Sequence, residues 1–303
     1  MSNKKDFFDL ETIKKHRPNL SDSSLKTYRS ILTNLYKKIN PEDKYDKDYF
    51  ITHPRQVIIF LKDIKPGLRK TTLSALTVYT LDDDKVSNLY KIQMMKDGKV
   101  YSDDIINQEK TKKQKENWIT QDEVLLKYNA LEKVVKPIFN DSGSLSTRDL
   151  EKIQDYIIAS VYVLIPPRRL LDYSDFKLKD YVEGEDNYMK NGSFYFNKFK
   201  TAKFKKDTFK VPTKLKNIIQ KWGRISESKF LLFQSRNKDK QISPSFLNSS
   251  LHRIFGGKIS VNNLRHSFLT DYYKDTPALK DMNQIADQMG HSISTALEYV
   301  KKD

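Results

Sequence analysis

The sequence predicts a mainly helical α+β protein that carries a small antiparallel β-sheet. Apolar residues recur at spacings of three and four over most of the 303 residues, which is typical of amphipathic helices. Short β-rich runs occur at 193–199 and 208–211, on either side of a lysine-rich turn, and indicate a hairpin. Hydrophobic residues make up 38% of the chain and charged residues 31%, a balance that allows a buried core.

Charge and cysteine content restrict the class of function. Lysine and arginine number 55 against 39 aspartates and glutamates, so the net charge is +16. Nucleic acid is the commonest partner of so basic a chain; an anionic membrane surface or a generally lysine-rich protein is the alternative. With no cysteine, the chain has no disulfide, thiol nucleophile or cysteine-bound zinc, and nothing points to secretion. No apolar run approaches the ~20 residues of a membrane span, and the first ten residues lack a signal-peptide core.

Composition divides the chain into four parts. Residues 1–20 are short and mixed in charge, and we expect an N-terminal arm. Residues 21–108 show four helical patterns and predict a small all-helical bundle. Residues 109–117 are almost wholly polar and fit a linker or a solvated helix end; we favour the linker. A second domain is expected over 118–303, because a new apolar pattern begins there.

The second domain is expected to hold a small sheet surrounded by helices. Another buried strand is expected near 229–233. The predicted helices are 119–135, 148–165, 244–255, 260–273, 279–289 and 295–301.

Two adjacent arginines follow two prolines at the end of an apolar helix. Asp172 comes three residues after Arg169, so on a helical turn it can brace that guanidinium. The same pattern also fits an ordinary surface pair, Arg168 and Arg169, at a helix end.

Lysine and aromatic residues alternate in the predicted hairpin turn, 197–206, with Asp207 as the only acid nearby. Such a turn can follow a phosphate backbone. A soluble turn that discourages edge pairing of the sheet has the same composition.

A helical pattern near residue 265 combines an apolar face with polar groups. Asn262, Arg265 and His266 are three or four residues apart, which places them on one flank of a helix. A buried arginine satisfied by local carbonyls is the alternative.

The C-terminal stretch contains a histidine and a tyrosine after turn signals. Gly290 suits a left-handed helix cap, after which His291 leaves the helix at a defined angle. Thr295 and Glu298 fit a capping box, which would put Tyr299 in the first turn of a short terminal helix. Capping alone explains the histidine, and packing alone explains the tyrosine.

Taken together, these motifs resemble the tyrosine recombinases, also called the phage-integrase family. The run Leu264-Arg265-His266-Ser267-Phe268, followed by Met289-Gly290-His291-Ser292 and then Tyr299, carries the resemblance. The resemblance covers residues 118–301. Residues 21–115 look like the family's helical core-binding domain, although they contain no sharp motif. The motif Pro166-Pro167-Arg168-Arg169 is more similar to recombinases of viruses and mobile elements of eukaryotic cells than to bacterial chromosome-dimer resolvases.

The resemblance implies a site-specific recombinase or integrase that cleaves DNA without a metal or cofactor. Tyr299 would attack the phosphate and form a 3′-phosphotyrosine, so the bond free energy is conserved. Arg169 and Arg265 would clamp the non-bridging oxygens. Lys200 would protonate the departing 5′ oxygen, with Lys203 as the alternative.

Further roles and one departure also follow from the resemblance. His291 would hydrogen-bond the phosphate, and His266 would act as a structural brace. Asp172 and Asp180 fall where the family often has acids. The family usually has histidine at the position of Asn262, and asparagine cannot carry a proton near neutral pH. Tyr299 also lies eight residues after His291, one fewer than in many relatives.

The implied partner is double-stranded DNA, bound by a homo-tetramer whose free form is a monomer or weak oligomer. No membrane partner is expected. The place of action is intracellular and DNA-associated, in host cytoplasm, nucleus or virion. Two alternatives remain: a DNA-binding protein of this fold with weakened chemistry, and a type IB topoisomerase-like enzyme. Further expected DNA contacts are Lys198, Lys203, Lys205, Lys206 and Arg168.

Overall fold

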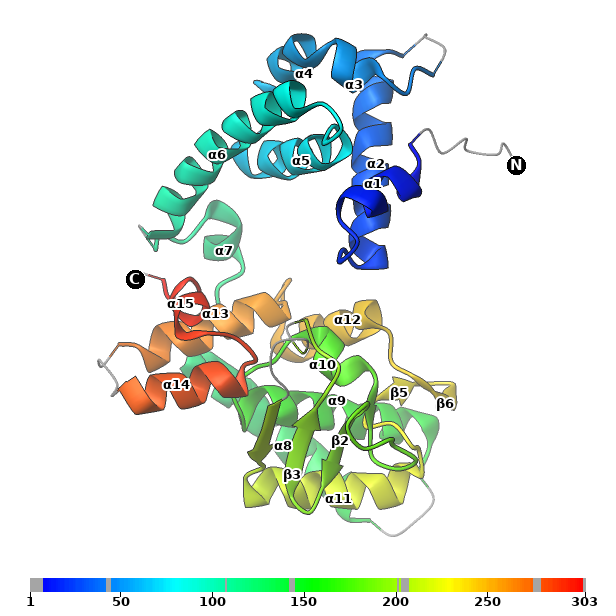
Figure 1. The fold of residues 1–303 in the computed structure, drawn as a ribbon. Helices are drawn as coiled ribbons and strands as arrows, with labels where there is room; N and C mark the ends of the chain where they lie inside the picture. The colour runs from blue at the N-terminus through cyan, green and yellow to red at the C-terminus, as the bar shows by residue number, and fades with distance from the viewer. Residues whose placement is uncertain are drawn as a thin grey trace. The chain divides into compact units, whose positions relative to one another are not determined.

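The computed structural model has an α+β fold that is mainly helical, and it divides into two compact units, Met1–Asn107 and Gln108–Asp303 (Figure 1). It describes residues 8–41, 45–106, 108–141, 145–200, 202, 207–274 and 279–301. Over these ranges, every helix is too short or too polar to cross a membrane.

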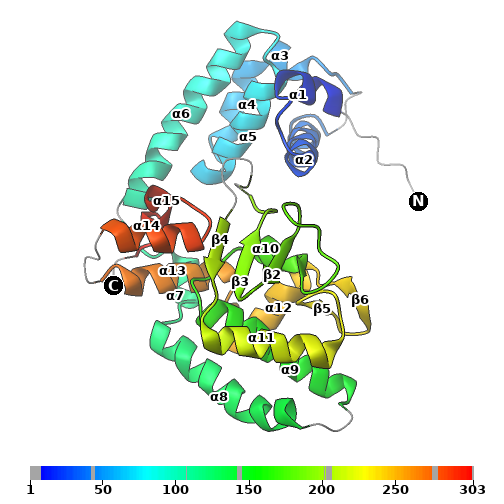
Figure 2. The same cartoon turned by 60° about the horizontal axis from the view of Figure 1, so that its bottom comes forward.

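The N-terminal unit is helical over its described residues. Helices α5 and α6 pack against each other along their lengths (Figures 1 and 2). Prolines at the first position begin α4 and α5, where a missing backbone N–H costs nothing. The helices are α1 (Leu10–His16), α2 (Asp22–Ile39), α3 (Tyr49–Thr52), α4 (Pro54–Leu61), α5 (Pro66–Tyr79) and α6 (Asp84–Ile106).

The expectation of an N-terminal arm over 1–20 is wrong for the residues that the structure describes. Helix α1 is capped by Asp9, whose carboxylate accepts from the Glu11 amide, and Ile13 is fully buried. Phe8 stacks on Phe50 with ring centroids 5.2 Å apart. Leu10 and Leu20 also pack against the core that contains Phe8 and Ile13, so apolar side chains dock this segment on the bundle.

The C-terminal unit contains nine helices and six strands in its described part. The helices are α7 (Lys112–Glu116), α8 (Gln121–Asn140), α9 (Thr147–Val163), α10 (Leu170–Ser174), α11 (Thr213–Ser226), α12 (Pro244–Phe255), α13 (Val261–Tyr272), α14 (Leu279–Gln288) and α15 (Ile293–Leu297). The strands are β1 (Phe176–Lys177), β2 (Asn187–Lys190), β3 (Ser193–Phe196), β4 (Asp207–Lys210), β5 (Phe233–Gln234) and β6 (Asn237–Gln241).

The main sheet has the order β1-β2-β3-β4 and is mixed. The expected hairpin is present, because β3 pairs antiparallel with β4 in a register that sets Phe194 opposite Phe209. The sheet is not wholly antiparallel, however, since the two-residue β1 joins β2 in parallel. Figure 2 shows β4 beside α14, so the hairpin reaches the C-terminal helices.

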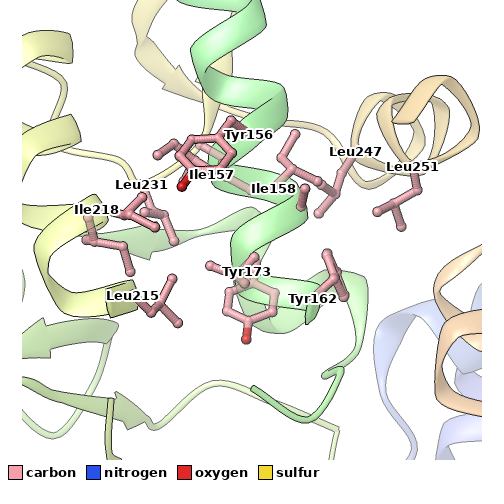
Figure 3. Packing of buried hydrophobic residues seen from close by; sticks show 14 of the residues in the cluster. Tyr156, Ile157, Ile158, Tyr162, Tyr173, Leu215, Ile218, Leu231, Leu247 and Leu251 are labelled. Atoms are coloured by element: carbon pink, nitrogen blue, oxygen red, sulfur yellow. The ribbon is translucent and has the colours of Figure 1, made fainter. Parts of the chain in front are cut away.

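Helix α9 forms the centre of the core of this unit. Figure 3 shows its apolar side chains between Leu215 and Ile218 of α11 on one side and Leu247 and Leu251 of α12 on the other. Burial on both sides explains why nearly every residue from 156 to 162 is apolar. The C-terminal end of this rigid helix leads directly to the two arginines.

The polar segment 109–117 differs from a free linker. It contains α7, which begins with a capping box between Thr111 and Gln114. The Asn117 carbonyl accepts from the Asn263 side chain at 3.0 Å, so the segment is attached to α13. Polar residues of this segment form hydrogen bonds within the protein. Hydropathy alone cannot distinguish such residues from polar residues that are hydrated by solvent.

Candidate active site

The two adjacent arginines differ in where their side chains go. Pro166 and Pro167 prevent α9 from continuing, and Arg169 then caps α10 with extended backbone, φ −70° and ψ 154°. Arg168 is fully buried, whereas Arg169 is half-buried. The extended backbone turns the two guanidiniums in different directions.

Arg168 is enclosed by acids. Its Nε donates to Asp172 at 2.8 Å, and its Nη1 donates to Asp207. Two predictions are therefore wrong: Asp172 braces Arg168 and not Arg169, and Arg168 has no exposed surface to offer DNA. A buried guanidinium requires carboxylate partners, and the inward-facing arginine takes them.

Arg169 keeps most of its donors available. Its Nη1 donates to the carbonyl of Gly290 at 3.1 Å, and this is its one hydrogen bond to the described residues. A half-buried guanidinium anchored on one side is suited to a bidentate grip on a phosphate.

Arg265 comes from the first half of α13 and is fully buried. Its Nη1 donates to the Pro167 carbonyl at 2.7 Å, while Nε and Nη2 make no hydrogen bond to the described residues. The guanidinium carbon lies 4.7 Å from the ring centroid of Tyr299. Burial lowers the pKa of Arg265, and Tyr299 opposes that shift. Arginine remains charged in spite of such a shift.

His291 lies beside the same tyrosine. Its ring and that of Tyr299 are nearly parallel, at 10°, with centroids 5.7 Å apart. Its Nδ1 donates to the Ser292 carbonyl at 3.2 Å, and its buried Nε2 meets no partner among the described residues. Burial, followed by the charge of Arg265, lowers the pKa of His291 to about 3. The ring is therefore neutral at pH 7, with the lone pair on Nε2.

His266 holds Tyr299 through the backbone. Its Nδ1 donates to the Tyr299 carbonyl at 2.7 Å, and its Nε2 accepts from Gln114 at 3.1 Å. These two bonds require the neutral tautomer with the proton on Nδ1. Burial lowers the pKa of His266 to about 4. The contacts fit a brace, as the resemblance implies.

Tyr299 follows the last helix and does not lie in its first turn. Helix α15 begins after Ser292, whose hydroxyl accepts from the Thr295 amide, and it ends at Leu297. The predicted capping box at Thr295 and Glu298 is thus displaced by one helical turn. Ser292 and Thr295 are equally good local caps, and the turn after Gly290 selects the earlier one.

The predicted lysines contribute unequally. Lys200 is exposed in the connection that follows β3. The Lys198 ammonium is 2.7 Å from Asp186 and 3.6 Å from Asp175, so an acid pair already holds it. Lys203, Lys205 and Lys206 lie outside the described residues.

Asn262 and Asp180 are exposed and take no part in the arginine hydrogen bonds that the structure describes. Asn262 is exposed in the first turn of α13, one turn before Arg265, and makes no hydrogen bond to the described residues. Asp180 is exposed with a positive φ of 53° and lies in a turn after β1.

The structure adds two residues to which the sequence assigns no role. Asp207 begins β4 and pairs with Arg168, and Gln114 of α7 pairs with His266. One feature of the sequence could have identified Asp207, because it is the only acid beside a lysine-rich turn. No feature of the sequence could have identified Gln114, because its partner His266 is 152 residues away. Over the described ranges, no three histidine or acidic side chains group as metal ligands.

Comparison with solved structures finds chains of similar fold. No family model matches the chain, and no curated protein matches it. A solved crystal structure of XerA recombinase is similar over 97% of this chain and 93% of that one, with a TM-score of 0.44 and 14% identity. That similarity does not establish a family, so the candidate site rests on the contacts of this chain alone.

Proposed function

We propose that the protein cleaves and rejoins DNA strands through a covalent bond between Tyr299 and a 3′ phosphate. One observation carries the proposal. The buried Nε and Nη2 of Arg265 and the buried Nε2 of His291 have no hydrogen-bond partner in the part of the chain that the structure describes, and both side chains pack against the Tyr299 ring. Buried polar groups without partners are rare. The Arg265 donors suit a tetrahedral anion, and the lone pair on Nε2 of His291 suits the proton of the Tyr299 hydroxyl.

The charge balance supports an anionic ligand. Three arginines, Arg168, Arg169 and Arg265, meet two carboxylates, Asp172 and Asp207, so the cluster carries a net charge of +1. An excess positive charge in a buried site is costly until a counter-anion compensates it. A phosphodiester carries one negative charge and offers two oxygens for bidentate guanidinium contacts.

The reaction balances with the groups at hand. The Tyr299 oxygen bonds to phosphorus, and its proton passes to Nε2 of His291. The negative charge of the bound phosphodiester offsets the nearby arginines and raises the basicity of this ring, and the imidazolium then donates to a phosphate oxygen. Arg169 and Arg265 stabilise the charge that develops on the non-bridging oxygens. The bond from phosphorus to the 5′ oxygen breaks, and Lys200 protonates that oxygen. Reversal with another 5′ hydroxyl rejoins a strand.

The finer assignment is a site-specific recombinase or integrase of a virus or mobile element. In this assignment it acts as a homo-tetramer on double-stranded DNA, which the helical unit 21–108 and the catalytic unit both bind. Exposed lysines would contact the DNA backbone, so affinity falls with salt. Lys198 would have to leave Asp186 and Asp175 to join them. A binding protein without chemistry is the second candidate, and Asn262 is the observation that favours it.

Covalent trapping tests the proposal. A pool of nicked duplexes with randomised sequence lets the cleaved 5′ fragment diffuse away, so a phosphotyrosine adduct accumulates and survives denaturant. We expect an adduct with the wild type and none with Tyr299→Phe. Both proteins should bind DNA equally, because the phenol oxygen contributes little to phosphate contacts.

DNA that binds the wild type tightly but never forms an adduct would reject strand cleavage and favour the second candidate. Relaxation of plasmids without any selected site would instead identify a topoisomerase-like activity.

A further inference from the structure

The guanidinium of Arg168 touches both ends of the connection between β3 and β4. At the first end it lies 3.9 Å from the ring centroid of Phe196 and 5.2 Å from that of Phe199. At the second end its Nη1 donates to Asp207. Lys200 directly follows Phe199. One buried side chain therefore anchors the segment from which Lys200 projects.

The same guanidinium holds the turn that leads to His291. Three successive carbonyls of residues 288–290 each accept from a different arginine: Arg168 at 2.7 Å, Arg265 at 3.5 Å and Arg169 at 3.1 Å. The turn needs a positive φ of 72° at Gly290, and a Cβ there would lie 2.8 Å from Arg168 Nη2. Arg168 is thus packed directly against the backbone of this turn.

We propose that Arg168 is a positioning residue. It holds the connection that carries Lys200 (the lysine segment) and the turn 288–291 that carries His291 (the histidine turn) at a fixed distance around one phosphate. The proposal rests on the proposed function and extends it to a residue with no exposed surface. Its planar fork donates in three directions at once: to Asp172, to Asp207 and to the Gln288 carbonyl. A lysine ammonium cannot reproduce that arrangement.

A purely structural arginine makes a different prediction. Loss of packing alone would lower stability and slow every step of the reaction equally. Loss of positioning would most impair the step that needs Lys200, which is protonation of the leaving oxygen. A leaving group that needs no proton separates the two.

Three variants test the proposal. Arg168→Lys removes the fork and keeps the charge. Asp207→Asn weakens only the contact to the lysine segment. Arg253→Lys is the control, because the hydrogen bonds of Arg253 to the described residues go to Asp155 and Ser250, outside the candidate site.

The first measurement is amide hydrogen exchange, which does not depend on activity. Arg168→Lys should speed exchange in 207–210 and in 286–292 together, and Asp207→Asn should do so in 207–210 alone. Arg253→Lys should leave both segments at the wild-type rate. Unchanged exchange of either segment in Arg168→Lys overturns the proposal.

The second measurement is single-turnover cleavage of trapped sites. Arg168→Lys should cleave about 100-fold more slowly while its DNA affinity stays within about twofold, as expected when general acid catalysis is lost. Replacing the bridging 5′ oxygen by sulfur should restore at least a tenth of the wild-type rate, because a thiolate leaves without a proton. An equal deficit on both substrates refutes positioning. Absence of adduct with the wild type refutes the proposed function instead.

Discussion

Gly290 offers a quantitative test of how tightly Arg168 is held. In Gly290→Ala the new Cβ would lie 2.8 Å from Arg168 Nη2 and 3.3 Å from its Cζ. Arg168 cannot swing away, because hydrogen bonds to Asp172, Asp207 and Gln288 pin it in a fully buried site. Either the backbone of the turn must shift, or one of these hydrogen bonds of Arg168 must break.

The expected cost has two parts. Alanine at a positive φ costs about 1 kcal/mol or somewhat more. Losing one hydrogen bond to a charged group adds about 1.5–3 kcal/mol. Gly257→Ala isolates the first part, since Gly257 has φ 55° and nothing within 4 Å of its would-be Cβ. We therefore expect about 3 kcal/mol for Gly290→Ala and about 1 kcal/mol for Gly257→Ala.

Urea unfolding followed by tryptophan fluorescence measures both values. The chain has two tryptophans, Trp118 and Trp222, and both belong to the C-terminal unit, so the signal reports that unit alone. Equal destabilisation of the two variants, within about 0.5 kcal/mol, would show that Arg168 is free to move. That result would remove the basis for its positioning role.

The remaining predictions concern proton-carrying groups. Because His266 falls from an ordinary pKa of 6.5 to about 4 in the folded state, the stability it contributes is present above pH 6.5 and is lost as the pH falls toward 4. We expect wild-type protein to lose about 2 kcal/mol more than His266→Asn between pH 7.5 and pH 5, measured by urea unfolding; parallel losses would contradict this. His291, with a pKa of about 3, stays unprotonated down to pH 5. The pH profile of adduct formation should therefore show no step near pH 6.5 that is due to His291; a step there in the wild type that is absent in His291→Gln would contradict this. Asn262→His should maintain or raise the cleavage rate, since histidine can carry a proton where asparagine cannot; a large fall would assign the asparagine a role of its own.

Periodicity predicted α8, α9, α12, α13 and α14 of the C-terminal unit, because each buries apolar side chains at helical spacing. It did not predict α7, α10 or α11, and the last helix was expected at 295–301, later than Ile293–Leu297. The pattern of α9 follows from its place between α11 and α12. The hairpin of β3 and β4 was also predictable, since its residues alternate around a polar turn. The parallel pairing of β1 was not, because two residues carry no period.

Side-chain partners in the site were only partly predictable. The motifs identified Arg265, His291 and Tyr299, which the structure brings together. They assigned Asp172 to the wrong arginine, because local spacing allows both i+3 and i+4 pairs and only the tertiary fold determines which arginine is buried. The Arg168–Asp207 pair spans 39 residues and depends on the closure of the sheet.

The most direct measurement is the identity of the residue that carries the DNA. Trypsin cleaves after Lys280 and Lys301, and the peptide between these sites contains a single tyrosine, Tyr299. After trapping, nuclease digestion and trypsin, mass spectrometry should find the peptide 281–301 with a nucleotide phosphate on Tyr299. A nucleotide on any other peptide, or none from DNA that the protein binds tightly, would contradict the assignment of Tyr299 as the nucleophile.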